Sequence, residues 1–422
     1  MMKKPILLLS FMVLLVACEG MTTTATPTFV TTTPSSMSQA SETAEPAATA
    51  TAIPPTETSI PAGERLAFAE ITAPGKPYPE SSVITFANSD GSQLEHPSLY
   101  QQFAGQHQHL VFSPNGRYLV FNDTYVSANR DRAPSDLYVA DTYSETVAKV
   151  ELPEIIKYDP WYGIPSWSSD SKLITFIALK VESAAVSTGI FAWDTVSRQL
   201  RQIPTEATDS IYRYATWSPF GESILFASFP EPLPTPGLLV RYGDLYTMKS
   251  DGTELSALGP TFYKYTPGVR SPNPMYLNEG PVWSPDGQWI AFFFLKDSES
   301  PAIGLKNVTS HELRVVELAS TSYWDLAWSP DSTRLAFVGH QKGDEIFLLT
   351  LDSGQITNLT QSTGDDFNPT WSPSGHQIAF ISDREENESY KLYVMNADGT
   401  NPAKVSDAPV MSRPVWIPES NP

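Results

Sequence analysis

An aromatic residue followed by Ser-Pro, or by a close variant of it, recurs along the chain, and this repeat limits the possible folds more than any other feature. Successive copies are 43 to 66 residues apart. An apolar stretch that is typical of a β-strand follows each of the first six copies. The seven aromatic residues are Phe112, Trp167, Trp217, Trp283, Trp328, Trp371 and Trp416.

The seventh copy lacks its strand, because only six residues follow Trp416. The missing strand stands at the other end of the repeats, where residues 63–68 align with residues 116–121. One repeat unit is therefore divided between the two ends of the chain. We expect the strand around Val415 and Trp416 to pair with the strand from Arg65 to Ala69, which would remove an exposed sheet edge.

Each unit also contains a tight turn of Asp-Gly, Ser-Gly or Asn residues between two apolar stretches, which is typical of a β-hairpin. A unit then comprises four antiparallel strands, as in a propeller blade. We therefore expect an all-β fold: a seven-bladed β-propeller of four-stranded antiparallel blades, closed by pairing of the N- and C-terminal strands. A six-bladed ring is the alternative. The repeated tryptophans are expected to pack between neighbouring blades and to be structural.

Residues 1–17 predict a bacterial lipoprotein signal peptide. Two lysines precede an apolar stretch from Pro5 to Ala17, which is shorter than the roughly 20 residues of a membrane-spanning helix. Cys18 stands where lipidation requires it, although an ordinary signal peptide or an uncleaved anchor is the alternative. Residues 18–62 predict a lipidated cysteine and a disordered tether rich in Thr, Pro, Ala and Ser, followed by the propeller in residues 63–422. We expect a bacterial cell-envelope protein, lipid-anchored on the extracytoplasmic side of a membrane.

The charge of the chain argues against one class of partner. Its formal net charge is −20 at pH 7, whereas nucleic acids and anionic lipid surfaces need Lys and Arg for neutralisation. No nucleic-acid partner is expected, and membrane contact should occur through the lipid anchor only. The chain has a single cysteine, which excludes an intrachain disulfide and a metal site built from several thiolates.

Two segments carry a resemblance to a known family. Residues 371–384, Trp-Ser-Pro-Ser-Gly-His-Gln-Ile-Ala-Phe-Ile-Ser-Asp-Arg, and residues 392–400, Leu-Tyr-Val-Met-Asn-Ala-Asp-Gly-Thr, resemble the repeats of TolB-type β-propellers. The resemblance extends over roughly residues 63–418. It implies an extracytoplasmic propeller that binds proteins or peptides; related propellers also gate the substrates of serine peptidases. The chain departs from TolB in residues 21–62, which cannot form the small α/β domain that precedes the propeller there.

The sequence contains no familiar catalytic motif. It lacks a Gly-x-Ser-x-Gly nucleophile elbow, a Gly-x-x-x-x-Gly-Lys phosphate loop and a His-Glu-x-x-His zinc helix. His107 and His109 stand two residues apart, which on a strand places both side chains on one side and could provide two metal ligands. No third ligand is identified, so we expect a solvated pair at the start of a strand, with metal binding as the alternative.

The loops that lead into the repeated aromatics are unusually rich in aromatic and polar residues. In a propeller these loops surround the mouth of the central channel, and rings beside hydrogen-bonding groups suit a peptide or a carbohydrate. Capping of the blades is the alternative role. We expect an acidic and aromatic funnel in which all candidates except Trp161, Tyr214, Glu279 and Trp324 are exposed. The ligand-binding candidates are His107, His109, Trp161, Tyr162, Tyr212, Arg213, Tyr214, Glu279, Tyr323, Trp324, Asp325, Asp366, Asn368 and Arg413.

Two functions follow from these patterns. The first is a non-catalytic, monomeric binding module for an envelope protein, peptide or glycan, with no cofactor and no metal. The alternative is a propeller enzyme, a metal-assisted lyase or hydrolase. It would use His107, His109 and acidic residues in the channel, such as Glu279, Asp325 and Asp366.

Overall fold

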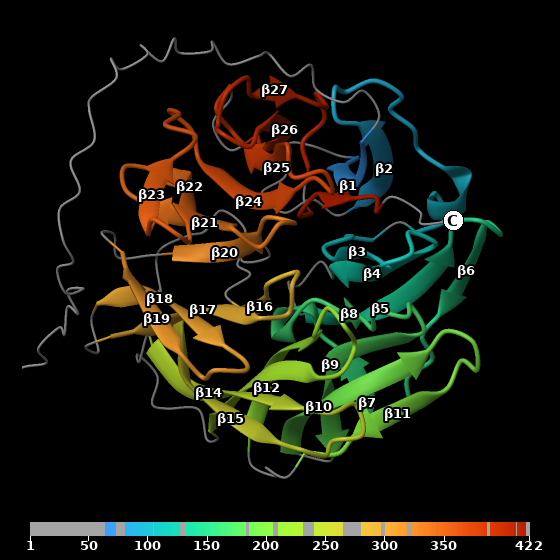
Figure 1. Cartoon of the computed structure of the whole chain (residues 1–422). Helices are drawn as coiled ribbons and strands as arrows, with labels where there is room; N and C mark the ends of the chain where they lie inside the picture. The colour runs from blue at the N-terminus through green and yellow to red at the C-terminus, as the bar shows by residue number, and fades with distance from the viewer. Residues whose placement is uncertain are drawn as a thin grey trace, which may run out of the picture. The chain divides into compact units, whose positions relative to one another are not determined.

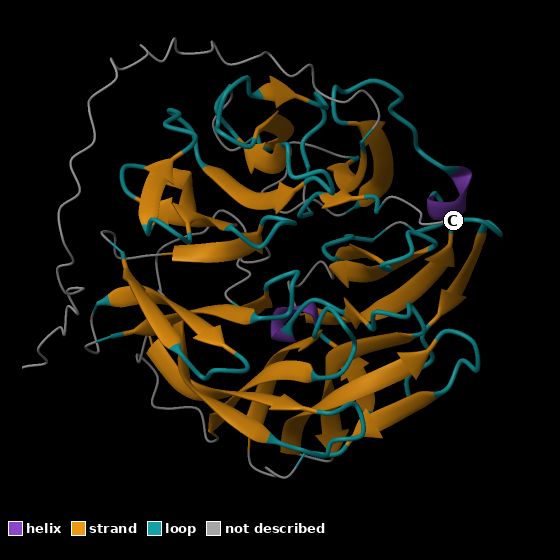
Figure 2. Ribbon diagram, in the orientation of Figure 1, coloured by secondary structure: helices purple, strands orange, loops and turns teal. Residues whose placement is uncertain are grey.

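The computed structural model describes twelve segments of the chain, all within one compact unit, Ser59–Pro422. Among these residues the regular elements are strands, apart from the short 3-10 helices η1 (Ser98–Tyr100) and η2 (Pro160–Tyr162) (Figure 2). No helix in this part of the chain is long and apolar enough to cross a membrane. The predicted signal, Cys18, the tether and Glu279 lie outside the described residues. The described residues are 64–72, 81–103, 105–126, 132–182, 185–205, 210–230, 240–264, 280–296, 300–318, 323–385, 389–410 and 412–418.

The first sheet contains strands from opposite ends of the chain. Its order is β2-β1-β28, with β1 (Arg65–Ile71), β2 (Ser82–Asn88) and β28 (Val415–Trp416). β1 is antiparallel to β28, and Leu66 pairs with Trp416 while Ala67 pairs with Val415. Strands whose paired residues are separated by nearly the whole repeat region thus share one ladder of hydrogen bonds.

The next sheet has nine strands and contains two four-stranded meanders. One meander is β3-β4-β5-β6 and the other is β8-β9-β10-β11, and β7 joins them by pairing with β5 and with β9. The strands are β3 (Leu110–Phe112), β4 (Tyr118–Val126), β5 (Arg132–Asp141), β6 (Thr146–Lys149), β7 (Ile156–Tyr158), β8 (Ser166–Trp167), β9 (Leu173–Glu182), β10 (Ala185–Asp194) and β11 (Leu200–Ile203).

Four further sheets each have four antiparallel strands in sequence order. The first contains β12 (Ser210–Trp217), β13 (Ile224–Pro230), β14 (Val240–Met248) and β15 (Ser256–Lys264), and the second contains β16 (Val282–Trp283), β17 (Trp289–Leu295), β18 (Pro301–Asn307) and β19 (Leu313–Glu317). The third contains β20 (Tyr323–Trp328), β21 (Arg334–His340), β22 (Asp344–Thr350) and β23 (Gln355–Asn358). The fourth contains β24 (Asp366–Trp371), β25 (Gln377–Ser382), β26 (Lys391–Asn396) and β27 (Ala403–Lys404).

Each sheet packs against the next one along the chain (Figure 1). Strand β25 is an example of a strand that is apolar on both faces. Ile378 and Phe380 belong to one buried cluster, whereas Ala379 and Ile381 belong to another. Alternate residues of a strand point to opposite faces, so both faces of this sheet are buried against neighbours. The contacts between sheets join β3 to β28, β8 to β12, β15 to β17, β16 to β20, β20 to β24 and β24 to β28.

The repeated tryptophans form a recurring bond between neighbouring sheets. The indole N–H of Trp371 donates to the carbonyl oxygen of Ala327, one residue before the preceding repeated aromatic, at 3.0 Å. Equivalent bonds link Trp167 to Val111, Trp328 to Val282 and Trp416 to Thr370 at 3.1 to 3.2 Å. Among the described residues, the buried indole nitrogens of Trp217 and Trp283 have no hydrogen-bond partner. The recurring bond is therefore missing at two successive repeats.

Candidate functional site

The funnel of exposed side chains predicted from the sequence is not present in that form. Five of its ten members are buried: His107, Tyr212, Asp325, Asp366 and Asn368 are at most 3% exposed. The other five are only partly buried, namely His109, Tyr162, Arg213, Tyr323 and Arg413. Among the remaining candidates, Trp324 is buried and Tyr214 is partly buried, while the Trp161 side chain and all of Glu279 lie outside the description.

Tyr212 illustrates why the prediction of exposure was wrong. Its ring packs edge-on against Phe226, with ring centroids 5.6 Å apart, inside a buried cluster that includes Trp217. Tyr323 likewise stacks against Phe293 of the preceding sheet at 6.4 Å. Both rings contribute to the packing, and truncating a fully buried aromatic such as Tyr212 typically costs about 3–5 kcal/mol.

The two histidines face different partners. Residues 106–109 do not form a regular strand, so the alternation expected of a strand does not hold there. The Nδ1 atom of His107 lies 2.9 Å from the Ser82 hydroxyl, whereas Nδ1 of His109 lies 2.9 Å from the Tyr158 hydroxyl. Burial lowers the pKa of each imidazole to about 4. The expectation of a solvated histidine pair is therefore wrong for His107, which is fully buried, and the two described imidazoles do not face each other as two ligands of one metal would.

Three candidates from successive repeats do come together. Asp325, Asn368 and Arg413 each stand three residues before a repeated tryptophan. The backbone N–H of Asn368 donates to Asp325 Oδ2 at 3.1 Å, and Arg413 donates to the carbonyl of Pro369 at 2.9 Å. Burial lowers the pKa of the Arg413 guanidinium, and the nearby Asp325 carboxylate opposes that shift. These residues tie neighbouring inner strands to each other.

The same position carries unusual backbone geometry. Asp325 and Asn368 have φ values of 57° and 56°, and Tyr214 has 60° at the equivalent place in β12. The strand register shifts at each of them. Asp and Asn adopt this left-handed conformation readily, but a bulky aromatic residue does so rarely. Tyr214 therefore marks a strained point on an inner strand.

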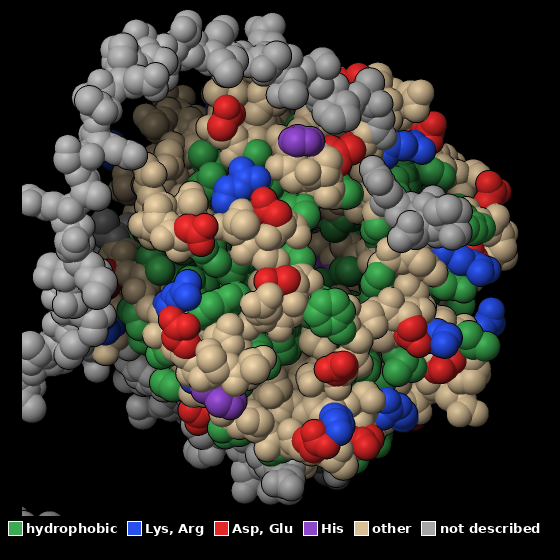
Figure 3. Space-filling model, viewed as in Figure 1, with side chains coloured by type: hydrophobic (Ala, Val, Ile, Leu, Met, Phe, Trp, Pro, Cys, Tyr) green, Lys and Arg blue, Asp and Glu red, His purple; other side chains and the backbone are tan. Residues whose placement is uncertain are grey.

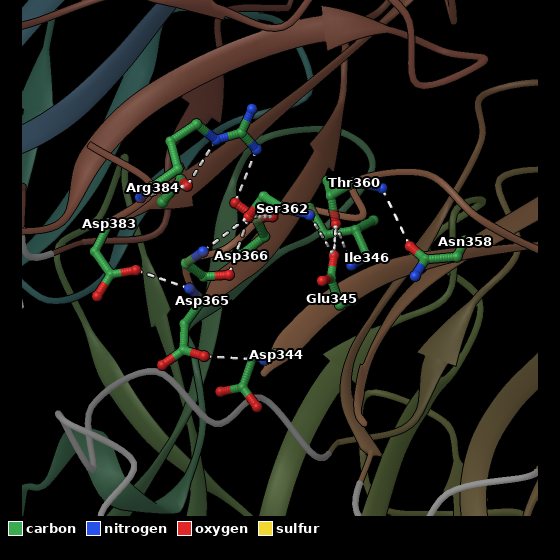
Figure 4. Close-up of polar contacts among 12 residues, drawn as sticks. Asp344, Glu345, Ile346, Asn358, Thr360, Ser362, Asp365, Asp366, Asp383 and Arg384 are labelled. Carbon is green, nitrogen blue, oxygen red and sulfur yellow. Dashed lines mark hydrogen bonds and ion pairs between the residues drawn. The ribbon is translucent and has the colours of Figure 1, made fainter. Parts of the chain in front are cut away.

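Asp366 belongs to a polar network between the last two four-stranded sheets (Figure 4). It accepts hydrogen bonds from Arg384 at 2.9 Å and from Ser362 at 2.8 Å. Nearby, Asp365 accepts a bond from the backbone N–H of Asp344. Burial first, and then the carboxylates of Asp365 and Asp383, raise the pKa of Asp344 to about 6 against the opposing bond from His340. Within the described residues no group of three or more His, Cys, Asp or Glu side chains is placed to hold a metal ion.

We expect Asp344→Asn to raise the free energy of unfolding at neutral pH by up to about 3 kcal/mol and to change it little below about pH 4. The raised pKa means that folded Asp344 holds a proton between about pH 4 and 6 that the unfolded chain releases. Its stabilising contribution is thus present below the unfolded-state pKa and is lost as the pH rises through 6. Urea unfolding across this range measures the effect. The same profile from Asp352→Asn, at an exposed turn, would contradict it.

A pocket of about 340 Å³ lies among the innermost strands of four consecutive repeats. Among the residues that the structure describes, its lining contains no charged side chain. Ser166 and Thr216 line it. By analogy with the bonded repeats, the carbonyl of Ser166 would accept the missing indole bond of Trp217, and the carbonyl of Thr216 would accept that of Trp283. The pocket and the break in the repeated bonding therefore coincide. It is lined by Val111, Phe112, Pro114, Ile164, Pro165, Ser166, Trp167, Tyr214, Ala215, Thr216, Gly280, Pro281 and Val282.

The sequence interpretation identified Tyr214 but missed the rest of this lining. Most of these residues stand one to three positions before a repeated aromatic, which is closer to that aromatic along the chain than most of the predicted loop candidates. Their signal is weak, because apolar residues beside a structural tryptophan are expected in any propeller. Figure 3 shows a face of the molecule that is hollowed near its centre and bordered by hydrophobic side chains.

The successive antiparallel sheets and their packing define a β-propeller protein. Residues 269–421 match the family described as "TolB beta propeller domain". The chain is 30% identical over 147 residues to the Tol-Pal system protein TolB of Alcanivorax borkumensis, a match that covers 34% of this chain and 30% of that relative. These matches confirm the resemblance to TolB-type repeats for the part of the chain in residues 269–421.

Solved structures share this fold at low sequence identity. The β-propeller domain of the Trilobed protease from Pyrococcus furiosus is 15% identical, with a TM-score of 0.52 over 82% of this chain and 95% of that one. An oligogalacturonate lyase in complex with manganese is 14% identical, with a TM-score of 0.52 over 74% of this chain and 82% of that one. At such identities the likeness extends to the fold alone.

Proposed function

We propose that this protein is a non-catalytic binding module, which holds an envelope protein, peptide or glycan in the channel of a seven-bladed propeller. The observation that carries the proposal is the pocket of about 340 Å³ between inner strands, whose described lining residues are all uncharged. Ligand pockets typically measure about 300–1,000 Å³ and have mostly apolar walls with a few polar groups. We further propose that the protein acts as a monomer, without a cofactor and without a nucleic-acid partner.

The contacts between sheets support seven blades and closure of the ring. The nine-stranded sheet counts as two blades, because it contains two four-stranded meanders. The pairing of β28 with β1 and the contact of β24 with β28 link the last blade to the first. Five sheets with one blade each and one sheet with two then give the seven repeats of the sequence.

Binding to arrays of peptides and of glycans tests the function. The full-length protein should select a defined set of ligands from one array and should leave them chemically unchanged. Tyr162, Arg213 and Tyr323 remain candidate contacts, because they are only partly buried. Turnover of oligogalacturonates or of peptide amides, with no selection on either array, would contradict the binding function and would indicate an enzyme.

We also propose that the protein is held at the extracytoplasmic side of a membrane by acylation of Cys18. The wild type should then partition into the detergent phase, and Cys18→Ser should remain in the aqueous phase. Two acyl chains give stable anchoring, whereas a single chain binds a membrane only marginally. Metabolic labelling with a fatty-acid analogue should mark the wild type only. Equal partitioning of the two proteins would refute the lipid anchor.

A further inference from the structure

We propose that the pocket takes the ring of a proline residue from an uncharged, extended peptide segment. This inference rests on the proposed binding function and narrows its ligand to one chemical class. It follows from two properties of the pocket, the rings in its walls and the state of its hydroxyl groups. Two nearby indole groups without partners then provide a way to test it.

The walls of the pocket present rings. Phe112, Trp167 and Tyr214 line it together with Pro114, Pro165 and Pro281. Flat apolar faces of this kind stack against the puckered ring of proline, and proline-rich segments dock on aromatic-lined surfaces elsewhere. Such segments are already extended in solution as polyproline II, so they lose little conformational entropy on binding.

The polar groups of the pocket disfavour a sugar or a charged side chain. The Ser166 and Thr216 hydroxyls are 3.2 Å apart, and Ser166 also accepts the backbone N–H of Trp217 at 3.0 Å. These hydroxyls are already engaged, so the several hydroxyls of a sugar ring would be desolvated with few partners. The described lining residues carry no charge, so none of them provides a counterion for a buried ion. Proline has no backbone N–H and enters without adding an unsatisfied donor.

The missing indole bonds make occupancy of the pocket measurable. A buried N–H without a partner is unfavourable, and Trp217 and Trp283 both have such a group. The strand segments whose carbonyls would accept hydrogen bonds from these indoles, at Ser166 and Thr216, form part of the pocket wall. A ligand that presses on these segments changes the surroundings of these two indoles, whereas Trp371 and Trp416 are already bonded.

Titration with N-acetyl-prolyl-prolinamide, followed by NMR of the indole N–H signals, tests the proposal on the full-length protein. We expect the signals of Trp217 and Trp283 to shift at millimolar probe, while those of Trp371 and Trp416 stay in place. N-acetyl-alanyl-alaninamide should bind at least tenfold more weakly. An equal response to both probes, or tighter binding of N-acetyl-phenylalaninamide, overturns the assignment to proline.

Val111 and Val415 provide a matched pair of variants. Each stands one residue before a repeated aromatic and is partly buried, but only Val111 lines the pocket. Val111→Phe should fill the pocket and weaken probe binding at least tenfold, whereas Val415→Phe should leave it unchanged. Val282→Phe fills the same pocket from another strand and replaces Val111→Phe if that variant unfolds. Equal binding by the pocket-filled and control variants refutes the site.

The array experiment distinguishes a failure of the proline assignment from a failure of the proposed binding function. If the wild type selects peptides that Val111→Phe and Val282→Phe still bind equally well, the protein remains a binding module and the pocket assignment is wrong. If the peptide array selects nothing and the glycan array does, the peptide class itself is wrong.

Discussion

Deletion of residues 410–422 should destabilise the whole propeller by at least about 5 kcal/mol, in one cooperative step. The deletion removes β28 and the buried Trp416 side chain, whose loss alone is comparable to a core tryptophan truncation of about 3–5 kcal/mol. It also removes the indole bond from Trp416 to Thr370 and the bond from the backbone N–H of Ala69 to Ser412. Urea unfolding followed by tryptophan fluorescence and by circular dichroism measures the loss.

The control is a shorter deletion of residues 419–422, which keeps β28 and should leave the unfolding midpoint nearly unchanged. The two spectroscopic probes should move together in the longer deletion, because the first and last repeats share a sheet. A partial loss of signal with the main transition unchanged would mean that the C-terminal strand is only a loose end on a six-bladed ring.

Lowering the pH from about 6.5 to about 4 should destabilise the fold by up to about 7 kcal/mol through His107 and His109 together. Burial lowers the pKa of both imidazoles to about 4. The unfolded chain therefore binds more protons than the folded protein between these pH values, and stability falls as the pH falls. Asp344, whose pKa is raised to about 6, acts in the opposite direction and offsets part of this loss.

Substitution separates the contributions. His107→Gln and His109→Gln should each remove about 3 kcal/mol of this pH dependence, whatever they cost at neutral pH. His376→Gln is the control, because that side chain is exposed. Free energies of unfolding measured in urea at several pH values give the slopes directly. A slope that is unchanged in both His107→Gln and His109→Gln would show that other groups cause the acid sensitivity.

The fold was predictable because each repeat carries its own local signals. The aromatic-Ser-Pro motif marks the end of an inner strand, and the serine hydroxyl is used in the turn that follows. Ser168, for example, donates to Asp170 at 2.7 Å and accepts the N–H of Leu173 at 2.9 Å. The division of one repeat between the chain ends also predicted the partner of β28, because the missing strand could be aligned letter by letter with the others.

The site was less predictable because residue type does not report exposure. Tyr212 and Tyr323 have the composition of ligand contacts, yet their rings fill spaces between and within sheets. His107 and Asp325 are polar, yet they are fully buried. The register shift that places Asp325 and Asn368 inward depends on a positive φ angle, which no alternation rule anticipates. The pocket coincides with two absent hydrogen bonds, which no sequence pattern reports.

The sharing of one sheet between the two chain ends sets an order of events during biosynthesis. β1 is made early, but its partner β28 lies 350 positions later, from Leu66 to Trp416. At about 5–20 residues per second, the ribosome needs roughly 20–70 s to supply that partner. Until then one edge of β1 has no strand beside it, and such an edge can pair with another chain. Quality control of this protein should therefore be most demanding before β28 emerges, and chains that stop short of β28 should be the forms that aggregate.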